Sequence, residues 1–277
     1  MPRVSVVIPV FKAEPYIERC AVSLFSQTLD DVEYIFVDDC SPDRSMNILR
    51  EVLSRYPARI LQTRIERTPV NSGPAYTRNL GLKLASGDYI ITCDSDDYVD
   101  TRMYGTLYRK ALESGAALVQ CDIAVQDGQT LLRTLSAPPG ELTSDRLRTG
   151  IINGELSNSL CNKLVKRDLY HHPEFIFPKG DIDEDNAISV QLAYFADKLA
   201  YVREPFYKAC RHPESITHKP GKEQTARRIQ ASRTNRRLIV HFLRSHGYGP
   251  LSRPVIKAWL RPVALRFREG MRRLRSR

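Results

Sequence analysis

The sequence has only six cysteines among 277 residues, and no two of them form a CxxC pair. Zinc clusters and disulfide frameworks need cysteines at close, regular spacings, so neither class is indicated. No apolar run approaches the ~20 residues needed to cross a bilayer, and Met1 leads directly into a strand-like segment rather than a signal peptide. We therefore expect a protein that stays in the reducing cytoplasm.

Glycine-rich phosphate loops are also missing. The first strand-like run ends in Pro9-Val10-Phe11 with no GxGxxG after it, and GxxxxGK[ST] occurs nowhere in the chain. Both motifs hold phosphates on backbone N–H groups, so their absence argues against an ordinary NAD site and against a P-loop.

Positive charge is concentrated at one end of the chain. The whole sequence has 42 Lys/Arg and 32 Asp/Glu, a net charge of +10. Residues 222–277 hold 16 of those basic residues and two acidic ones, so this stretch has a charge of +14 and residues 1–221 have −4. The basic character belongs to the tail and says nothing about the substrate of the main domain.

The rest of the chain alternates between two hydrophobic periods. Apolar β-branched runs predict strands over 4–8, 33–37, 59–62 and 89–93, and apolar residues at helical spacing predict helices over 14–27, 44–56, 75–85 and 103–112. This order favours an α/β fold with a mostly parallel central sheet flanked by helices. A short strand over 116–121 precedes loops or an edge hairpin at 122–150, and a second αβ portion follows up to residue 218.

Acidic clusters follow two of the expected strands, where ligands of such sheets bind. Three carboxylates within Asp94-Ser95-Asp96-Asp97 repel one another unless a cation lies among them, and oxygen ligands of this kind suit Mn²⁺ or Mg²⁺. A solvated turn that caps the next helix is the alternative. Of the pair Asp38-Asp39, one carboxylate can cap the second helix, and the other is then free to accept hydrogen bonds from a base or ribose.

Together these segments resemble the family 2 glycosyltransferases in order and spacing, over about residues 1–218. The early motifs are VSVVIPVF (4–11), SQT (26–28), VDDCSPD (37–43), GPAYTRNLG (73–81), GDYI (87–90) and DSDD (94–97). The later ones are NKL (162–164), ED (184–185) and RHPESIT (211–217).

The resemblance implies a GT-A fold with a nucleotide-binding half (about 1–115), a metal-binding DxD element and an acceptor half (about 116–218). It implies that Asp39 faces a uracil base and that Asp94 reaches the ribose. It places Arg78 near the sugar and phosphates, and a structural ion pair is an equally open role for this residue. The other expected donor-binding residues are Pro9, Val10, Phe11, Glu14 and Ser95, and the expected metal ligands are Asp96 and Asp97.

The same resemblance matches Asp185 to the catalytic base, with Glu184 beside it binding the acceptor or orienting the loop. An attacking hydroxyl must lose its proton, so a carboxylate is needed on the far side of the sugar from the leaving group. The acidic run 181–185 supplies several candidates. A helix start favoured by the macrodipole is the alternative explanation of this run. His212 can approach the metal or phosphate, or be polar surface.

Residues 219–277 are expected to form a basic helical tail. From Pro254 onward, apolar residues follow one helical face and arginines the other, which is typical of a helix that binds an anionic membrane surface. Docking of the apolar stripe onto the catalytic domain is an alternative. Nucleic acid is not expected as a partner, because no recognised RNA- or DNA-binding module accompanies the charge.

The sequence thus predicts an inverting, Mn²⁺- or Mg²⁺-dependent transferase that moves a sugar from a nucleotide diphosphate donor, expected to be a UDP-sugar. The expected acceptor is a hydroxyl of a glycan or lipid-linked glycan, and the expected place is the inner face of the cytoplasmic membrane. Two alternatives stay open at this point: a metal-dependent nucleotidyltransferase and a non-catalytic nucleotide-sugar or carbohydrate-binding protein.

Overall fold

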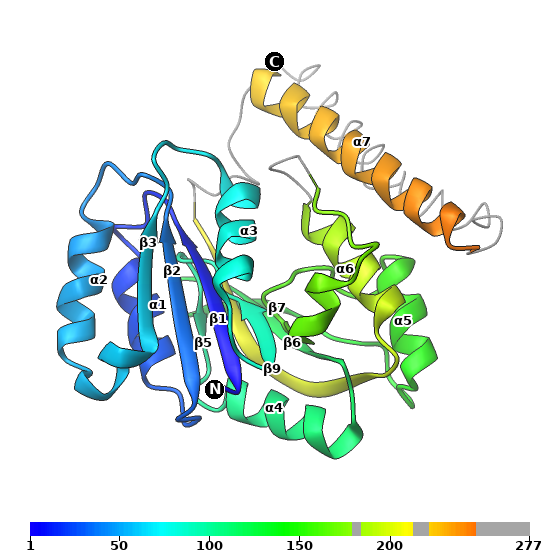
Figure 1. Cartoon of the computed structure of the whole chain (residues 1–277), viewed down its shortest axis with the longest axis horizontal. Helices are drawn as coiled ribbons and strands as arrows, with labels where there is room; N and C mark the ends of the chain where they lie inside the picture. The colour runs from blue at the N-terminus through cyan, green and yellow to red at the C-terminus, as the bar shows by residue number, and fades with distance from the viewer. Residues whose placement is uncertain (179–183, 213–221, 248–277) are drawn as a thin grey trace.

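The structure, a computed structural model, describes residues 1–178, 184–212 and 222–247 (Figure 1). Its first half contains four parallel strands in the order β3-β2-β1-β4, which are β1 (Val4–Val10), β2 (Val32–Asp38), β3 (Thr63–Arg67) and β4 (Tyr89–Thr92). Because the strands are parallel, their carboxyl ends meet at one edge of the sheet.

The second half extends the same sheet with strands of mixed direction. β8 (Lys163–Lys166) pairs antiparallel with β4 and with β6 (Leu118–Asp127), and β6 pairs parallel with β9 (Leu199–Arg211). β5 (Tyr98–Val99) adds to β9, and β7 (Thr130–Leu135) forms the expected edge hairpin with β6. One continuous sheet therefore connects the two halves.

Helices cover both faces of this sheet, and the alternation of side chains along the strands explains why. In β1, Val4, Val6 and Ile8 point to one face, which is covered by α1 (Ile17–Phe25), α2 (Ser45–Ser54) and α4 (Met103–Ser114). Val7 points to the other face, which is covered by α3 (Pro74–Leu84), α5 (Ser144–Ile152) and α6 (Glu184–Phe195). The α/β class with a mainly parallel sheet between helices is confirmed.

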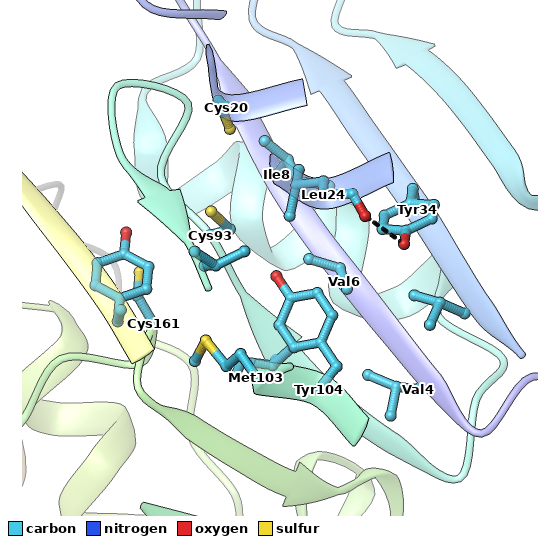
Figure 2. Packing of buried hydrophobic residues seen from close by; sticks show 14 of the residues in the cluster. Val4, Val6, Ile8, Cys20, Leu24, Tyr34, Cys93, Met103, Tyr104 and Cys161 are labelled. Carbon is cyan, nitrogen blue, oxygen red and sulfur yellow. Dashed lines mark hydrogen bonds between the residues drawn. The ribbon is translucent and has the colours of Figure 1, made fainter. Parts of the chain in front are cut away.

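Figure 2 shows the first of these cores, with Tyr34 of β2 donating a hydrogen bond of 2.6 Å to the carbonyl oxygen of Leu24. Four buried thiols lie in the same core, those of Cys20, Cys93, Cys121 and Cys161, and Figure 2 labels all of them except Cys121. The contact with Cys20 and burial raise the pKa of Cys93 well above its usual value, and burial does the same for Cys161. All six cysteines are free.

Two local predictions were wrong. Residues Pro57–Gln62 form a 3₁₀ helix (η1) instead of a strand, and β3 begins only at Thr63. Pro57 suits the first turn of a helix, and the buried Arg59 donates from Nη2 to the carbonyl oxygen of Gln27 at 2.7 Å, which fixes the turn. Helix α5, which the sequence analysis missed, begins after Thr143, whose hydroxyl oxygen accepts from the backbone N–H of Arg146.

The basic tail begins with α7 (Lys222–Ser245), which packs against the helix that starts with the ED motif. Ile239, Phe242 and Leu243 of α7 form a small core with Ala187 and Val190 of α6. This part of the tail is docked. The amphipathic stretch expected beyond Pro254, like the boundary near residue 219, lies outside the described residues. None of the helices in the described ranges combines the length and apolar character that a transmembrane segment requires.

The close packing of α3 against β1 at Gly81 leads to a stability prediction. A Cβ at Gly81 would overlap the Cγ1 methyl of Val7, whereas a Cβ at the helical Gly105 of α4 would meet Thr28 Oγ1 only at 3.6 Å. We expect Gly81→Ala to lower the free energy of unfolding by about 1–3 kcal/mol through overpacking. Gly105→Ala, the matched control, should leave it unchanged or raise it by up to about 1 kcal/mol. Urea denaturation measures both, and equal effects would contradict this account of the α3 contact.

Candidate active site

The carboxyl ends of β1, β2 and β4 gather the polar motifs of the sequence as expected. The backbone N–H of Asp39 donates to the carbonyl oxygen of Val10 at 2.8 Å, which links the ends of β1 and β2. The side chain of Val10 is buried in the core, while Pro9 is half-buried and Phe11 is 43% exposed. Of these three residues expected to bind the nucleotide-sugar donor, Phe11 has the most exposed side chain.

The carboxylate of Asp39 organises the segment that leads into α3. It accepts hydrogen bonds from Thr68 Oγ1 (2.9 Å) and from the backbone N–H groups of Ser72 and Gly73 (2.8 Å each). Among the described residues, one of its oxygens accepts only the bond from Gly73, so it keeps capacity for another donor. Glu14, another expected donor-binding residue, accepts a hydrogen bond of 2.8 Å from the backbone N–H of Arg44 at the start of α2.

After β4, the carboxylate oxygens of Asp94, Asp96 and Asp97 lie within 4.8 Å of one another. Asp97 is hydrogen-bonded to β9 through both of its carboxylate oxygens. One accepts from the Tyr207 hydroxyl (2.6 Å), and the other accepts from the backbone N–H of Cys210 (2.7 Å). Burial, together with the charges of Asp96 and Asp94, raises the pKa of Asp97 well above its usual value. The buried Ser95 separates Asp94 from Asp96.

Asp94 and Asp96 are the more open members of this acidic cluster. Although 42% of the Asp94 side-chain surface reaches solvent, the surrounding protein raises its pKa to about 6, against the pull of the Arg78 guanidinium. Asp96 lies 2.6 Å from Nε2 of His212, at the end of β9. The His212 ring also packs on Tyr16, with 4.5 Å between the ring centroids. Crowded oxygens beside an imidazole are a donor set that fits a divalent cation.

Arg78, in α3, lies at the centre of the site. Its side chain is 6% exposed and donates through Nη1 to Glu184 and through Nη2 to Asp94 at 3.3 Å. Nη1 also lies 3.4 Å from a carboxylate oxygen of Asp185. Burial lowers the pKa of Arg78, but the three carboxylates outweigh it and raise that pKa well above the usual value. Of the two roles left open by the sequence, the structure shows the ion pair.

The first turn of α6 presents the two remaining candidates differently. The Glu184 side chain is 9% exposed and is engaged by Arg78, whereas the Asp185 side chain is 28% exposed. An oxygen of Asp185 accepts a hydrogen bond from the backbone N–H of Leu160 at 3.3 Å. Asp185 is therefore the more accessible carboxylate of the pair. Asp181 and Asp183 lie outside the described residues.

Sequence reasoning missed two tyrosines of this site. Tyr207 donates to Asp97 across 110 residues of chain, and Tyr16 supports the His212 ring. Neither residue belongs to a cluster or periodic pattern that would have singled it out, because both act through contacts that only the folded chain creates.

Residues 5–172 match the sequence model of Glycosyl transferase family 2. The chain belongs to this family. It is 30% identical over 243 residues to the uncharacterized glycosyltransferase EpsJ of Bacillus subtilis (strain 168), an alignment that covers 83% of the chain and 67% of EpsJ. The nucleotidyltransferase and the non-catalytic binding protein are thereby set aside: the protein is a glycosyltransferase.

Solved structures of other proteins agree with the GT-A fold. Staphylococcus aureus TarS 1–349 in complex with UDP-GlcNAc superposes with a TM-score of 0.68 at 19% identity, over 91% of this chain and 74% of that one. TarS is also known as poly(ribitol-phosphate) β-N-acetylglucosaminyltransferase. The mannosyltransferase PcManGT of Pyrobaculum calidifontis, in complex with GDP-Man and Mn²⁺, gives a TM-score of 0.57 at 15% identity, over 95% and 80% of the two chains.

The ion pairs of Arg78 lead to a stability prediction. Arg78→Met leaves Asp94 and Glu184 without their counter-ion, so we expect the free energy of unfolding at pH 7 to fall by about 3–5 kcal/mol. The loss should shrink as the pH is lowered towards 5. In this variant the folded-state pKa of the buried Glu184 lies above its unfolded value, so protonation favours the folded chain.

The matched test adds Glu184→Gln to both backgrounds and follows urea denaturation. In the wild type this change should destabilise the protein, because it removes a partner of Arg78. In Arg78→Met it should restore stability, because it removes a buried charge that has lost its partner. An equal cost in both backgrounds would show that the ion pair does not hold this part of the structure.

Proposed function

We propose that this glycosyltransferase transfers a sugar from a UDP-sugar to an acceptor hydroxyl with inversion, and that Asp185 is the general base. The observation that carries the proposal is the Arg78 arrangement. It holds Asp94 of the acidic cluster at Nη2 and Asp185 beside Nη1 of the same guanidinium. A donor held at the cluster would then have one accessible carboxylate beside it that is not part of the cluster.

In this proposal, residues at the ends of β1, β2 and β4 bind the nucleotide-sugar donor. Asp39 accepts from the N3–H of uracil with its remaining lone pair, and Phe11 packs on the base. Asp94 faces the ribose, and the diphosphate lies near Asp96 and His212. The complex of TarS with UDP-GlcNAc supports uridine as the nucleoside, and TarS has the higher TM-score of the two solved relatives described above.

A divalent cation, Mn²⁺ or Mg²⁺, would be held by Asp96 with His212, and by Asp97 if that side chain released β9. When bound, it stabilises the negative charge that develops on the β-phosphate as the nucleoside diphosphate leaves. PcManGT, crystallised with Mn²⁺, supports a metal of this kind. The 2.6 Å contact between Asp96 and His212 supports their use as neighbouring ligands.

The acceptor side needs a single proton transfer. The acceptor oxygen attacks the anomeric carbon, the bond to the β-phosphate oxygen breaks, and the hydroxyl proton moves to a carboxylate oxygen of Asp185. The N–H of Leu160 and the guanidinium of Arg78 orient that carboxylate, and Glu184 stays with Arg78 as a positioning residue. The name of TarS supports a glycan-type acceptor, which here includes lipid-linked glycans of polysaccharide synthesis.

The tail supports a location at the inner face of the cytoplasmic membrane. The face of α7 turned away from α6 carries exposed Arg233, Arg237, His241 and Arg244, and an anionic lipid surface is the partner that fits this charge. Since α7 packs on α6, whose first turn holds Asp185, binding through α7 would bring the acceptor site close to lipid-linked substrates.

One pair of variants tests the chemical proposal. Asp185→Asn should reduce transfer by ~10²- to 10⁴-fold, the usual cost of a lost general base, while calorimetry shows UDP binding in Mn²⁺ as in the wild type. Asp96→Ala should lose both transfer and metal-dependent UDP binding. NMR of the wild-type product should show the inverted anomer.

Glu184→Gln is the control for Asp185, since a general helix-start role predicts similar and modest losses from either change. Retention of more than about a tenth of wild-type transfer by Asp185→Asn would remove the base assignment. Full activity in EDTA would remove the metal assignment.

The membrane proposal is tested with two charge-matched double variants. Arg233→Gln/Arg237→Gln should weaken binding to vesicles with anionic lipid by roughly 30-fold at low salt, because each basic residue near such a surface contributes about 1 kcal/mol. Arg109→Gln/Arg133→Gln, which removes two exposed arginines from α4 and β7, should change it little. Vesicle co-sedimentation measures both, and equal losses would show a general charge effect instead of an oriented surface.

A further inference from the structure

The Lys163 side chain has no part in the reaction described so far, yet it is completely buried in β8. Its Nζ lies 2.6 Å from the carbonyl oxygen of Ser157, 2.7 Å from that of Ser159 and 3.2 Å from Oδ1 of Asn162. These three acceptors match the three N–H donors of an ammonium group. The Lys163 side chain therefore connects β8 to the residues that come just before it in the chain.

A buried cation of this kind is costly. Burial lowers the pKa of Lys163 to about 7, and the nearby negative charge of Asp185 opposes that change. A methionine of similar length would fill the same space without the desolvation cost. Methionine would, however, leave the carbonyl oxygens of Ser157 and Ser159 without this donor, so what Lys163 contributes is the geometry of the segment that carries them.

That geometry concerns the 157–160 segment, defined here as Ser157, Asn158, Ser159 and Leu160. The backbone N–H of Leu160 donates to Asp185, and Ser189 of α6 donates from its hydroxyl to the carbonyl oxygen of Asn158 at 2.8 Å. Gln120 of β6 donates to the carbonyl oxygen of Ser157 at 3.1 Å. The segment is tied to β8, β6 and α6, and it ends in the N–H group that touches the proposed base.

We propose that Lys163 is a positioning residue for proton transfer. By binding the carbonyl oxygens of Ser157 and Ser159, it fixes the 157–160 segment so that the Leu160 N–H holds Oδ2 of Asp185 while Oδ1 of the same carboxylate lies buried beside Nη1 of Arg78. The inference rests on the proposed role of Asp185 as the base. It adds a residue that touches neither donor nor acceptor but determines how well the base is aimed.

The test is Lys163→Met, which keeps the length of the side chain and removes its three donors. We expect kcat for transfer to fall about 10- to 100-fold, the scale of a misplacement of about 1 Å at a catalytic group. KM for the UDP-sugar and UDP affinity in Mn²⁺ should stay within about threefold of wild type. Lys166→Met, an exposed lysine of the same strand, is the matched control and should leave all of these values unchanged.

A double variant separates positioning from general destabilisation. If Lys163 acts through Asp185, then Lys163→Met added to Asp185→Asn should lower the residual transfer by less than about threefold. A second loss as large as the first would overturn the proposal. So would a normal kcat for Lys163→Met in a protein whose Asp185→Asn variant is inactive. High transfer activity of the Asp185→Asn variant would instead refute the assignment of Asp185 as the general base.

Ser189→Ala decides the case if Lys163→Met does not give a folded protein by circular dichroism. It removes one hydroxyl that holds the same segment at Asn158, without a change of charge or much of volume. We expect a milder reduction of kcat, about three- to tenfold, with KM for the donor unchanged. A wild-type kcat in folded Ser189→Ala would count against the positioning role of the 157–160 segment.

Discussion

The guanidinium of Arg78 is surrounded by carboxylates because a cation removed from water costs several kcal/mol unless opposite charge and hydrogen bonds replace the solvent. Asp94 comes from the end of β4, and Glu184 and Asp185 come from the start of α6. The folded chain must therefore bring α3, which carries Arg78, together with the end of β4 and the start of α6. The close contact of Gly81 with Val7 sets how deep α3 lies on the sheet, and thereby how far Arg78 reaches.

Within the acidic cluster, neighbouring carboxylates have different roles: some form structural hydrogen bonds and others are available to ligands. Asp97 fastens the turn after β4 to β9 through Tyr207 and the Cys210 backbone, so it helps to build the place that Asp96 occupies. Asp39 does the same for the 68–73 segment while keeping a lone pair free. Several carboxylates that look alike in the sequence are thus part of the frame, and fewer are left for ligands.

Much of the parallel half was predictable from the sequence, because buried parallel strands are continuous apolar runs and their ends carry the clusters at Asp39 and Asp94. The predictions failed where a local signal was overruled. The apolar letters of 59–62 indicated a strand, but the buried Arg59 fixes a 3₁₀ turn there. The α5 helix was hidden in a polar stretch with weak periodicity.

The site was less accessible to sequence reasoning than the fold. The position of the candidate residues at strand and helix ends could be inferred from motif order, but their partners could not. Arg78 and Glu184 are 106 residues apart, and Asp97 and Tyr207 are 110 apart. No periodicity or spacing connects residues at such separations, so the difference between a carboxylate that binds a ligand and one that holds the frame emerges only in three dimensions.

The link between Arg78 and Glu184 also limits how a family of such enzymes can diversify. A substitution of Arg78 leaves Glu184 without its partner, and a substitution of Glu184 takes one of three carboxylates from Arg78, so the two positions should vary together among relatives. Recombination between the first and second halves of the sheet faces the same constraint. A chimera inherits the buried ion pairs only if both parents carry the same charge arrangement around α3, which makes this junction a barrier to the exchange of halves during evolution.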